Sequence, residues 1–219
     1  THLLAQLGAA AQQAGRNPSD ITLVAVSKRQ SDEAIAAALE AGQRVFGENR
    51  VQEAVEHWGD RRAGIADLEL RLIGPLQSNK AQDAVELFDV IETLDRDKLA
   101  IALRKAMIAT GRTPRLLVQV NTGEEMQKAG IAPAELPGFL ARMSGEHGLR
   151  VEGLMCIPPT AEPAGLHFAL LAKLARDNGL RELSMGMSAD FETAIALGAS
   201  SVRIGTAFFG ARDQGSITR

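Results

Sequence analysis

A lysine at the end of an apolar segment is the first residue of this sequence that could carry covalent chemistry. Residues 21–26 read Ile-Thr-Leu-Val-Ala-Val, and Lys28 follows them after a single serine. An amine at that position has an apolar stem and a partly desolvated head, which disfavours its ammonium form. A neutral amine can attack an aldehyde and form a Schiff base. From position alone, Lys28 could also be an ordinary solvated lysine at a strand end.

Polar residues that could bind an anion lie near the other end of the chain. Ser188 precedes a predicted helix as its expected N-cap, and the N-terminus of a helix attracts anions. Arg203 lies in a short apolar run followed by Gly205 and Thr206, where a glycine permits close approach of a ligand to the backbone. Asn49 follows another apolar run and offers an amide donor, although it could serve only in a turn.

Short apolar runs alternate with helical patterns along the chain, and these elements must position the polar residues. We expect a leading helix at about residues 2–14 and strands at 21–26, 44–46, 70–73, 90–93, 116–120, 151–155, 181–184 and 201–204. Ser31 is an expected N-cap and Gly42 an expected C′ glycine of the helix after the first strand. Eight βα units predict an α/β fold, a single (β/α)8 TIM barrel over residues 1–219. A doubly wound open sheet is the alternative.

A closed barrel would bring the candidate residues together. Function in this fold lies at the C-terminal ends of the strands, and the loops after strands seven and eight commonly hold phosphate. Closure places strand eight beside strand one, so a phosphate bound there would lie near Lys28. Pyridoxal 5′-phosphate has both an aldehyde and a phosphate. A phosphosugar aldolase that forms a Schiff base would satisfy the same constraint.

Composition narrows the class of protein. Hydrophobic residues make up 45% of the 219 residues, enough for a sizeable core, and the net charge of −3 comes without a basic stripe, so we expect no nucleic-acid partner. We expect no membrane span and no signal peptide, and the single cysteine favours a reducing, cytoplasmic location. We expect Cys156 to be a buried structural thiol. His57, His147 and His167 lack metal-binding spacing, so we predict surface positions and no metal site.

Seven colinear blocks of sequence resemble the pyridoxal phosphate homeostasis protein family. They run in order from residue 22 to residue 210 and comprise residues 24–28 (VAVSK), 46–53 (FGENRVQE), 73–80 (IGPLQSNK), 120–130 (VNTGEE with KAG), 153–155 (GLM), 183–188 (LSMGMS) and 202–206 (VRIGT). The resemblance implies the fold of the barrel domain of alanine racemase, with a leading helix.

The resemblance also implies which residues bind the cofactor. The implied contacts are Lys28 as a Schiff base, Ser188, Gly205 and Thr206 at the phosphate, Arg203 at the pyridine nitrogen, Asn49 near the ring, and Met155 in the pocket wall. Members are credited with vitamin B6 homeostasis, in which they bind pyridoxal phosphate and protect it or deliver it to apoenzymes. We expect this chain to act as such a protein, as a monomer.

The alternative is a pyridoxal-phosphate-dependent enzyme with slow, racemase-like activity on amino acids. Arg203 cannot accept a proton from the pyridine nitrogen, so the ring would be a weak electron sink. Alanine racemase also uses a tyrosine from a second domain, whereas this sequence contains no tyrosine and we expect one domain only. We therefore expect no efficient racemisation.

One position departs from the pattern of the family. Members commonly carry histidine where this sequence has Arg71. Strand alternation leads us to expect that Arg71 points into the pocket, with its guanidinium near the mouth of the barrel and held by an acidic residue.

Overall fold

The computed structural model describes residues 2–210, so residue 1 and residues 211–219 of the expected domain lie outside the described part of the chain. Nine helices and eight strands alternate over this range. The strands are β1 (Thr22–Val26), β2 (Val45–Glu48), β3 (Glu69–Leu72), β4 (Val90–Leu94), β5 (Arg115–Gln119), β6 (Val151–Met155), β7 (Glu182–Ser184) and β8 (Ser201–Ile204). The helices are α1 (His2–Gln13), α2 (Asp32–Glu40), α3 (Val51–Trp58), α4 (Ala81–Leu87), α5 (Asp97–Thr110), α6 (Leu136–Gly145), α7 (Ala164–Asp177), α8 (Phe191–Ala196) and α9 (Thr206–Phe209).

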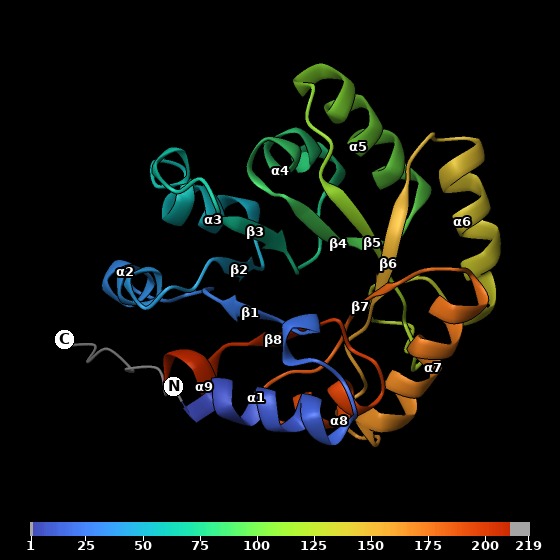
Figure 1. The fold of residues 1–219 in the computed structure, drawn as a ribbon. Helices are drawn as coiled ribbons and strands as arrows, with labels where there is room; N and C mark the ends of the chain where they lie inside the picture. Colours follow the sequence, from blue (N-terminus) through green and yellow to red (C-terminus); the bar gives the residue numbers. More distant parts are fainter. Residues whose placement is uncertain (1, 211–219) are drawn as a thin grey trace, which may run out of the picture.

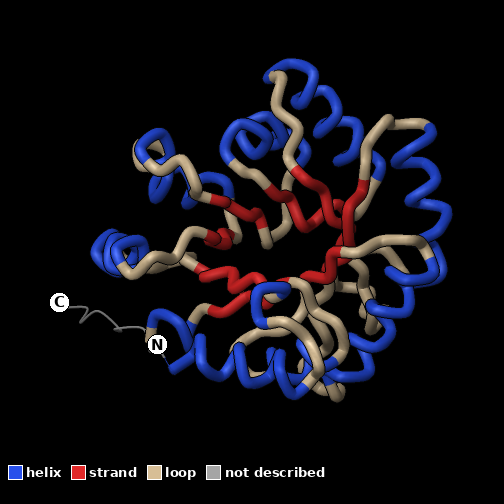
Figure 2. Tube along the Cα trace, in the orientation of Figure 1, coloured by secondary structure: helices blue, strands red, loops and turns tan. Residues whose placement is uncertain are grey.

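The eight strands form a closed parallel barrel in sequence order, with the helices outside it (Figures 1 and 2). The barrel closes where β1 pairs with β8, and Thr22 to Ala25 lie opposite Ser201 to Ile204. The expected (β/α)8 barrel is therefore confirmed, and the open doubly wound sheet is wrong. The leading helix is present as α1, which packs against α8 on the outside of the barrel. None of the helices within residues 2–210 combines the length and the apolar character that a membrane crossing requires.

The strands form where the chain has short runs that can be buried on both sides. β4 and β8 are buried at every position, and β1 at all but its first residue, as expected for parallel strands between a packed interior and a layer of helices. Local signals also end the elements. The Ser31 hydroxyl accepts a hydrogen bond from the Ala34 N–H at 3.2 Å at the start of α2. Gly42 adopts φ 91° just beyond its end, as expected.

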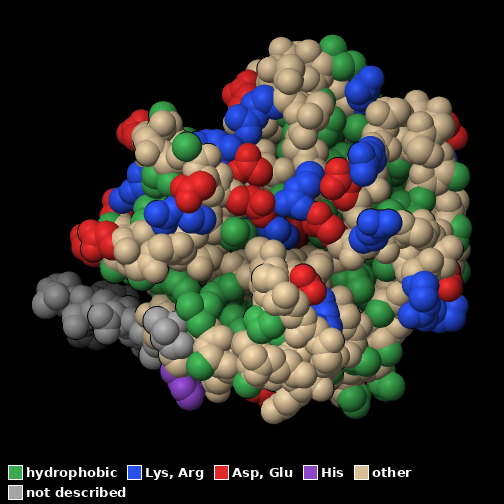
Figure 3. All heavy atoms as spheres, in the orientation of Figure 1, with side chains coloured by type: hydrophobic (Ala, Val, Ile, Leu, Met, Phe, Trp, Pro, Cys, Tyr) green, Lys and Arg blue, Asp and Glu red, His purple; other side chains and the backbone are tan. Residues whose placement is uncertain are grey.

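The hydrophobic core lies between the outer face of the barrel and the helices. Phe46 on β2 stacks at a tilt on Trp58 of α3 with 4.6 Å between ring centroids, and both side chains are fully buried. The interior of the barrel is different, because it contains arginine, glutamate and serine side chains. Viewed down the barrel, acidic and basic side chains lie next to one another over its centre (Figure 3).

Candidate functional site

A cavity of about 330 Å³ lies at the C-terminal ends of the strands, a size suited to a small-molecule ligand. Its lining residues come from the ends of β1, β2, β3, β6, β7 and β8 or from the loops that follow. They are Val26, Lys28, Gln30, Asn49, Ile73, Ile157, Met187, Ser188, Ala189, Arg203, Gly205 and Thr206. Six of the seven residues expected at a cofactor site therefore line one cavity.

Met155 is the expected residue that the cavity does not include. Its side chain is fully buried at the end of β6, and Ile157, two residues further on, forms that part of the wall. Sequence reasoning also missed Gln30 and Met187. A signal was available, since each lies within two residues of a residue that had been singled out.

Two glutamates hold the loop that carries Lys28. The Ser27 hydroxyl donates to Glu48 Oε1 at 2.6 Å, and the Arg29 N–H donates to Glu53 Oε1. Arg29 has φ 57°, a conformation that a residue with a side chain rarely adopts and that the surroundings must stabilise. The residues on either side of Lys28 are thus fixed, and the direction of its side chain follows from them.

Glu48 is the anchor of this loop. Its carboxylate is fully buried at the end of β2, and besides Ser27 it accepts from the Trp58 indole N–H at 3.1 Å. His57 Nδ1 lies 2.9 Å from the same oxygen. One possible ligand atom each from Glu48, Glu53 and His57 lies within 4.8 Å of the others, but hydrogen bonds to neighbouring residues account for this cluster. The sequence alone did not indicate these contacts, which join three separate elements.

Gly74 fixes Asn49 from the neighbouring strand. A Cβ atom at Gly74 would lie 2.2 Å from the Asn49 carbonyl oxygen, so only glycine permits this approach of the two turns. Asn49 thereby lies at the cavity wall, at the end of β2.

The hydroxyl groups of Ser188 and Thr206 border the cavity on the side of β7 and β8. Thr206 is the first residue of α9, whose first N–H groups have no acceptor within the helix. The expectation that Ser188 caps a helix is wrong. Asp190 precedes α8 directly and accepts from the Met187 N–H at 2.6 Å, which leaves Ser188 in the turn between them.

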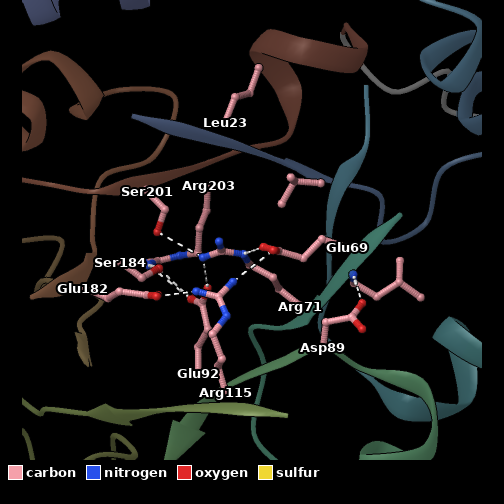
Figure 4. A network of polar contacts seen from close by, with 12 residues as sticks. Leu23, Glu69, Arg71, Asp89, Glu92, Arg115, Glu182, Ser184, Ser201 and Arg203 are labelled. Atoms are coloured by element: carbon pink, nitrogen blue, oxygen red, sulfur yellow. Dashed lines mark hydrogen bonds and ion pairs between the residues drawn. The ribbon is translucent and has the colours of Figure 1, made fainter. Parts of the chain in front are cut away.

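Arg203 lines the cavity from below and is anchored inside the barrel, where its side chain is only 4% exposed. One terminal nitrogen, Nη1, donates to Ser184 Oγ at 2.6 Å, and Nη2 donates to the Cys156 carbonyl at 2.8 Å. Figure 4 shows Arg203 and Ser184 among the polar side chains that converge from the strands on the barrel centre. A guanidinium has five N–H donors, so Arg203 retains donors for a ligand.

Arg71 points into the barrel and is held by acidic residues, as expected, but its depth was predicted wrongly. Its Nε donates to Glu69 Oε1 at 2.6 Å and its Nη1 to Glu92 Oε1 at 3.2 Å. Nη1 also contacts the hydroxyl of Ser201 at 3.4 Å. Glu69 and Ser201 begin their strands, so the guanidinium lies toward the N-terminal end of the barrel and does not line the cavity. Burial disfavours the charge of Arg71, but Glu92 and Glu69 outweigh this and raise its pKa.

Four other residues had been assigned from the sequence. Cys156 is buried as expected, and burial raises the pKa of its thiol to about 12. The surface position expected for His167 is wrong, because this residue is 5% exposed and its Nδ1 lies 3.1 Å from the Thr122 hydroxyl oxygen. His57 and His147 are also partly covered, each with a side chain 13% exposed.

The groups in the cavity suit a phosphorylated aldehyde. Lys28 supplies an amine, Ser188 and Thr206 supply hydroxyl donors, and Arg203 supplies a guanidinium. The cavity lining contains no carboxylate among the described residues, so an anion meets no like charge there. This donor set fits pyridoxal phosphate.

Comparison with known proteins places these features in a class. The model of the alanine racemase N-terminal domain family matches residues 4–213. The alanine racemase of Clostridium difficile 630 has the same fold, with a TM-score of 0.70 at 16% identity, and the match covers 97% of this chain and 57% of that one. The chain therefore belongs to the alanine racemase N-terminal domain family, and the closed parallel barrel is the fold that it shares with this alanine racemase.

Closer relatives define the group within it. A protein of Pseudomonas aeruginosa named pyridoxal phosphate homeostasis protein is 45% identical, covering 97% of this chain and 94% of the relative. The Escherichia coli K12 protein of that name is 43% identical over 97% of this chain and 96% of its own length. PipY of Synechococcus elongatus, solved with PLP bound, has a TM-score of 0.79 at 39% identity and covers 94% of this chain and 100% of that one. This chain belongs to the pyridoxal phosphate homeostasis protein family.

Proposed function

We propose that this chain binds pyridoxal 5′-phosphate through a Schiff base to Lys28 and serves the homeostasis of this cofactor as a monomeric, cytoplasmic protein of one domain. The observation that carries the proposal is that Lys28, Ser188, Gly205 and Thr206 line the same cavity. The PLP-bound structure of PipY and the names of the close relatives support the same cofactor.

Each residue of the cavity takes a role that its chemistry allows. Lys28 forms the covalent bond, while Ser188, Thr206 and the backbone at Gly205 bind the phosphate. Arg203 donates to the pyridine nitrogen, and Asn49 lies beside the ring. When bound, the cofactor supplies an aldehyde that amines can reach. The close relatives are named for homeostasis of the cofactor, so we include its delivery to apoenzymes in the proposal.

A carrier fits the residues better than an enzyme. A guanidinium has N–H donors and no acceptor, so Arg203 cannot take a proton from the ring nitrogen, which leaves the ring a weak electron sink. The sequence contains no tyrosine that could act as a base on the opposite face. Slow, racemase-like turnover is the second candidate, favoured only by the shared fold of alanine racemase.

Reduction with borohydride followed by peptide mapping tests the proposal. Because the reduction fixes a Schiff base as a stable amine, we expect a pyridoxyl group on Lys28 alone and no visible chromophore in Lys28→Ala. Lys80 and Lys128 provide internal controls, since both are partly exposed. A pyridoxyl group found mainly on either of them would refute the assignment.

A further inference from the structure

Six charged side chains of alternating sign lead from the N-terminal end of the barrel to the cavity. We call this set the charge chain, and in order it comprises Glu182, Arg115, Glu69, Arg71, Glu92 and Arg203. Figure 4 shows all six, which come from five strands, with Glu69 and Arg71 both on β3. Three glutamates and three arginines cancel in formal charge. The outer three are partly exposed, whereas Arg71, Glu92 and Arg203 are at most 4% exposed.

Ser184 joins the last two members of the charge chain. Its hydroxyl donates to Glu92 Oε2 at 2.6 Å and accepts from Arg203 Nη1 at 2.6 Å. A hydroxyl has one proton, so these two bonds fix its orientation. The direct distance from Arg203 Nη1 to Glu92 Oε2 is 3.9 Å, too long for a hydrogen bond. The Ser184 hydroxyl therefore bridges the guanidinium of Arg203 and the carboxylate of Glu92, which do not bond directly.

Glu92 divides its charge between two arginines. Oε1 accepts from Arg71 at 3.2 Å, while Oε2 faces Ser184 and Arg203. Without Arg71, no second cation would offset the carboxylate, and its whole charge would act on Arg203. The resulting change in electrostatic energy is large because the site is shielded from water.

Other titratable groups near Arg203 do not replace Glu92. Lys28, beyond β1, shares the cavity and is not an anion. Cys156, beyond β6, keeps its proton at neutral pH because burial raises its pKa to about 12. The charge of Asp190, before α8, contributes to raising the pKa of this thiol. Over residues 2–210, Glu92 is the only carboxylate within 4.0 Å of Arg203.

We propose that Ser184 and Glu92 position Arg203 against the cofactor ring, and that Arg71, by sharing Glu92, keeps the ring side of the cavity positive. Ser184, Glu92 and Arg71 are positioning residues, since none of them lines the cavity, whereas Arg203 lines it together with Lys28. The inference rests on the proposed function. A positive charge beside the bound cofactor disfavours its protonated form, so the charge chain lowers the pKa at which the bound chromophore titrates.

Spectroscopic titration of the holoprotein tests this inference. In Arg71→Met a side chain of similar length loses its charge, Glu92 then neutralises Arg203 more fully, and we expect the midpoint of the absorbance titration to rise by about 0.5–1 pH unit. Arg71→Lys keeps the charge and should titrate like the wild type. Lys173→Met removes an exposed charge on α7 and controls for net charge alone.

A second variant guards against misfolding, because Arg71→Met leaves two glutamates short of a partner. Arg71→Met with Glu69→Gln restores the balance of charge, and the same rise is expected because Glu92 still lacks Arg71. Ser184→Ala should also raise the midpoint, since Arg203 can then move to Glu92 directly.

The outcomes separate the inference from the proposed function. The proposed function predicts a cofactor absorbance in the wild type that is lost in Lys28→Ala. If this is not observed, the proposed function fails and the inference fails with it. If that absorbance is present but both Arg71→Met variants titrate like Arg71→Lys, only the inference is overturned.

Discussion

The hydroxyl groups of Ser188 and Thr206 line the same cavity as Lys28, and each comes from a different βα loop. Hydrogen bonds to a charged partner contribute about 1.5–3 kcal/mol each. Ser188→Ala and Thr206→Val should therefore each weaken cofactor binding by about 1–3 kcal/mol, roughly 5- to 150-fold in Kd. A fluorescence or absorbance titration of the apoprotein with PLP measures this. Ser144→Ala, on the exposed surface of α6, is the matched control. An unchanged Kd in the double variant would show that the phosphate binds elsewhere.

The thiol of Cys156 gives a second test at the scale of one residue. Because burial raises its pKa to about 12, almost no thiolate exists at pH 8. Alkylation by iodoacetamide should be about a thousandfold slower in the native protein than in urea, and it should accelerate about tenfold per pH unit. Mass spectrometry of timed samples measures the rate. Native and unfolded rates that agree would show that the thiol is accessible.

Neighbouring helices are joined by ion pairs that should respond to pH. At the start of α5, Asp97 accepts two hydrogen bonds from Arg142 of α6, at 3.1 and 3.0 Å, and lies 2.9 Å from His147 Nε2. Hydrogen bonds from Arg142 and His147 lower the pKa of Asp97 from 3.8 to about 2. A carboxyl group with a lowered folded-state pKa stabilises the fold above its unfolded pKa, and this is lost as pH falls from about 4 to 2.

Asp97→Asn should accordingly lower the free energy of unfolding at pH 7 by only about 0.5–1 kcal/mol, because the pair is 42% exposed on both sides and is screened by solvent. The difference from wild type should shrink as the pH falls from about 4 to about 2 in urea unfolding. Asp177→Asn, which breaks an exposed pair within α7, should have a smaller effect. A difference that persists at low pH would mean that the carboxylate charge is not the cause.

Elements and their order could be predicted because most strands are short apolar runs bounded by local signals. β6 and β8 have the predicted bounds, and β1 differs by one residue. Six of the seven expected cofactor residues line one cavity because strand order alone brings strand ends together. Arg71 was assigned the correct face of β3 but the wrong depth, since alternation along a strand says nothing about how a long side chain bends. The contacts of Glu48 and the charge chain as a whole could not be predicted, because most of the partners belong to other elements whose approach only the folded barrel defines.

The molecule as a whole should bind the cofactor without turning over amino acids at a useful rate. In the proposed complex Arg203 would leave the ring a weak electron sink, which stabilises a carbanion poorly. Incubation of D- or L-alanine with holoprotein in heavy water, followed by NMR of the α-proton, should show exchange no faster than with free cofactor. Exchange within tenfold of a typical enzyme turnover of roughly 10 per second would establish an enzyme instead. The Lys28→Ala variant supplies the background rate.

Closure of the barrel between β1 and β8 has a consequence for the order of events during synthesis. Lys28 leaves the ribosome before Arg203, Gly205 and Thr206, which line the same cavity. A nascent chain that ends before β8 has Lys28 without these three residues, and the strand that seals the barrel is missing. In the proposed complex, capture of the ligand would therefore report that the last strand has joined the first.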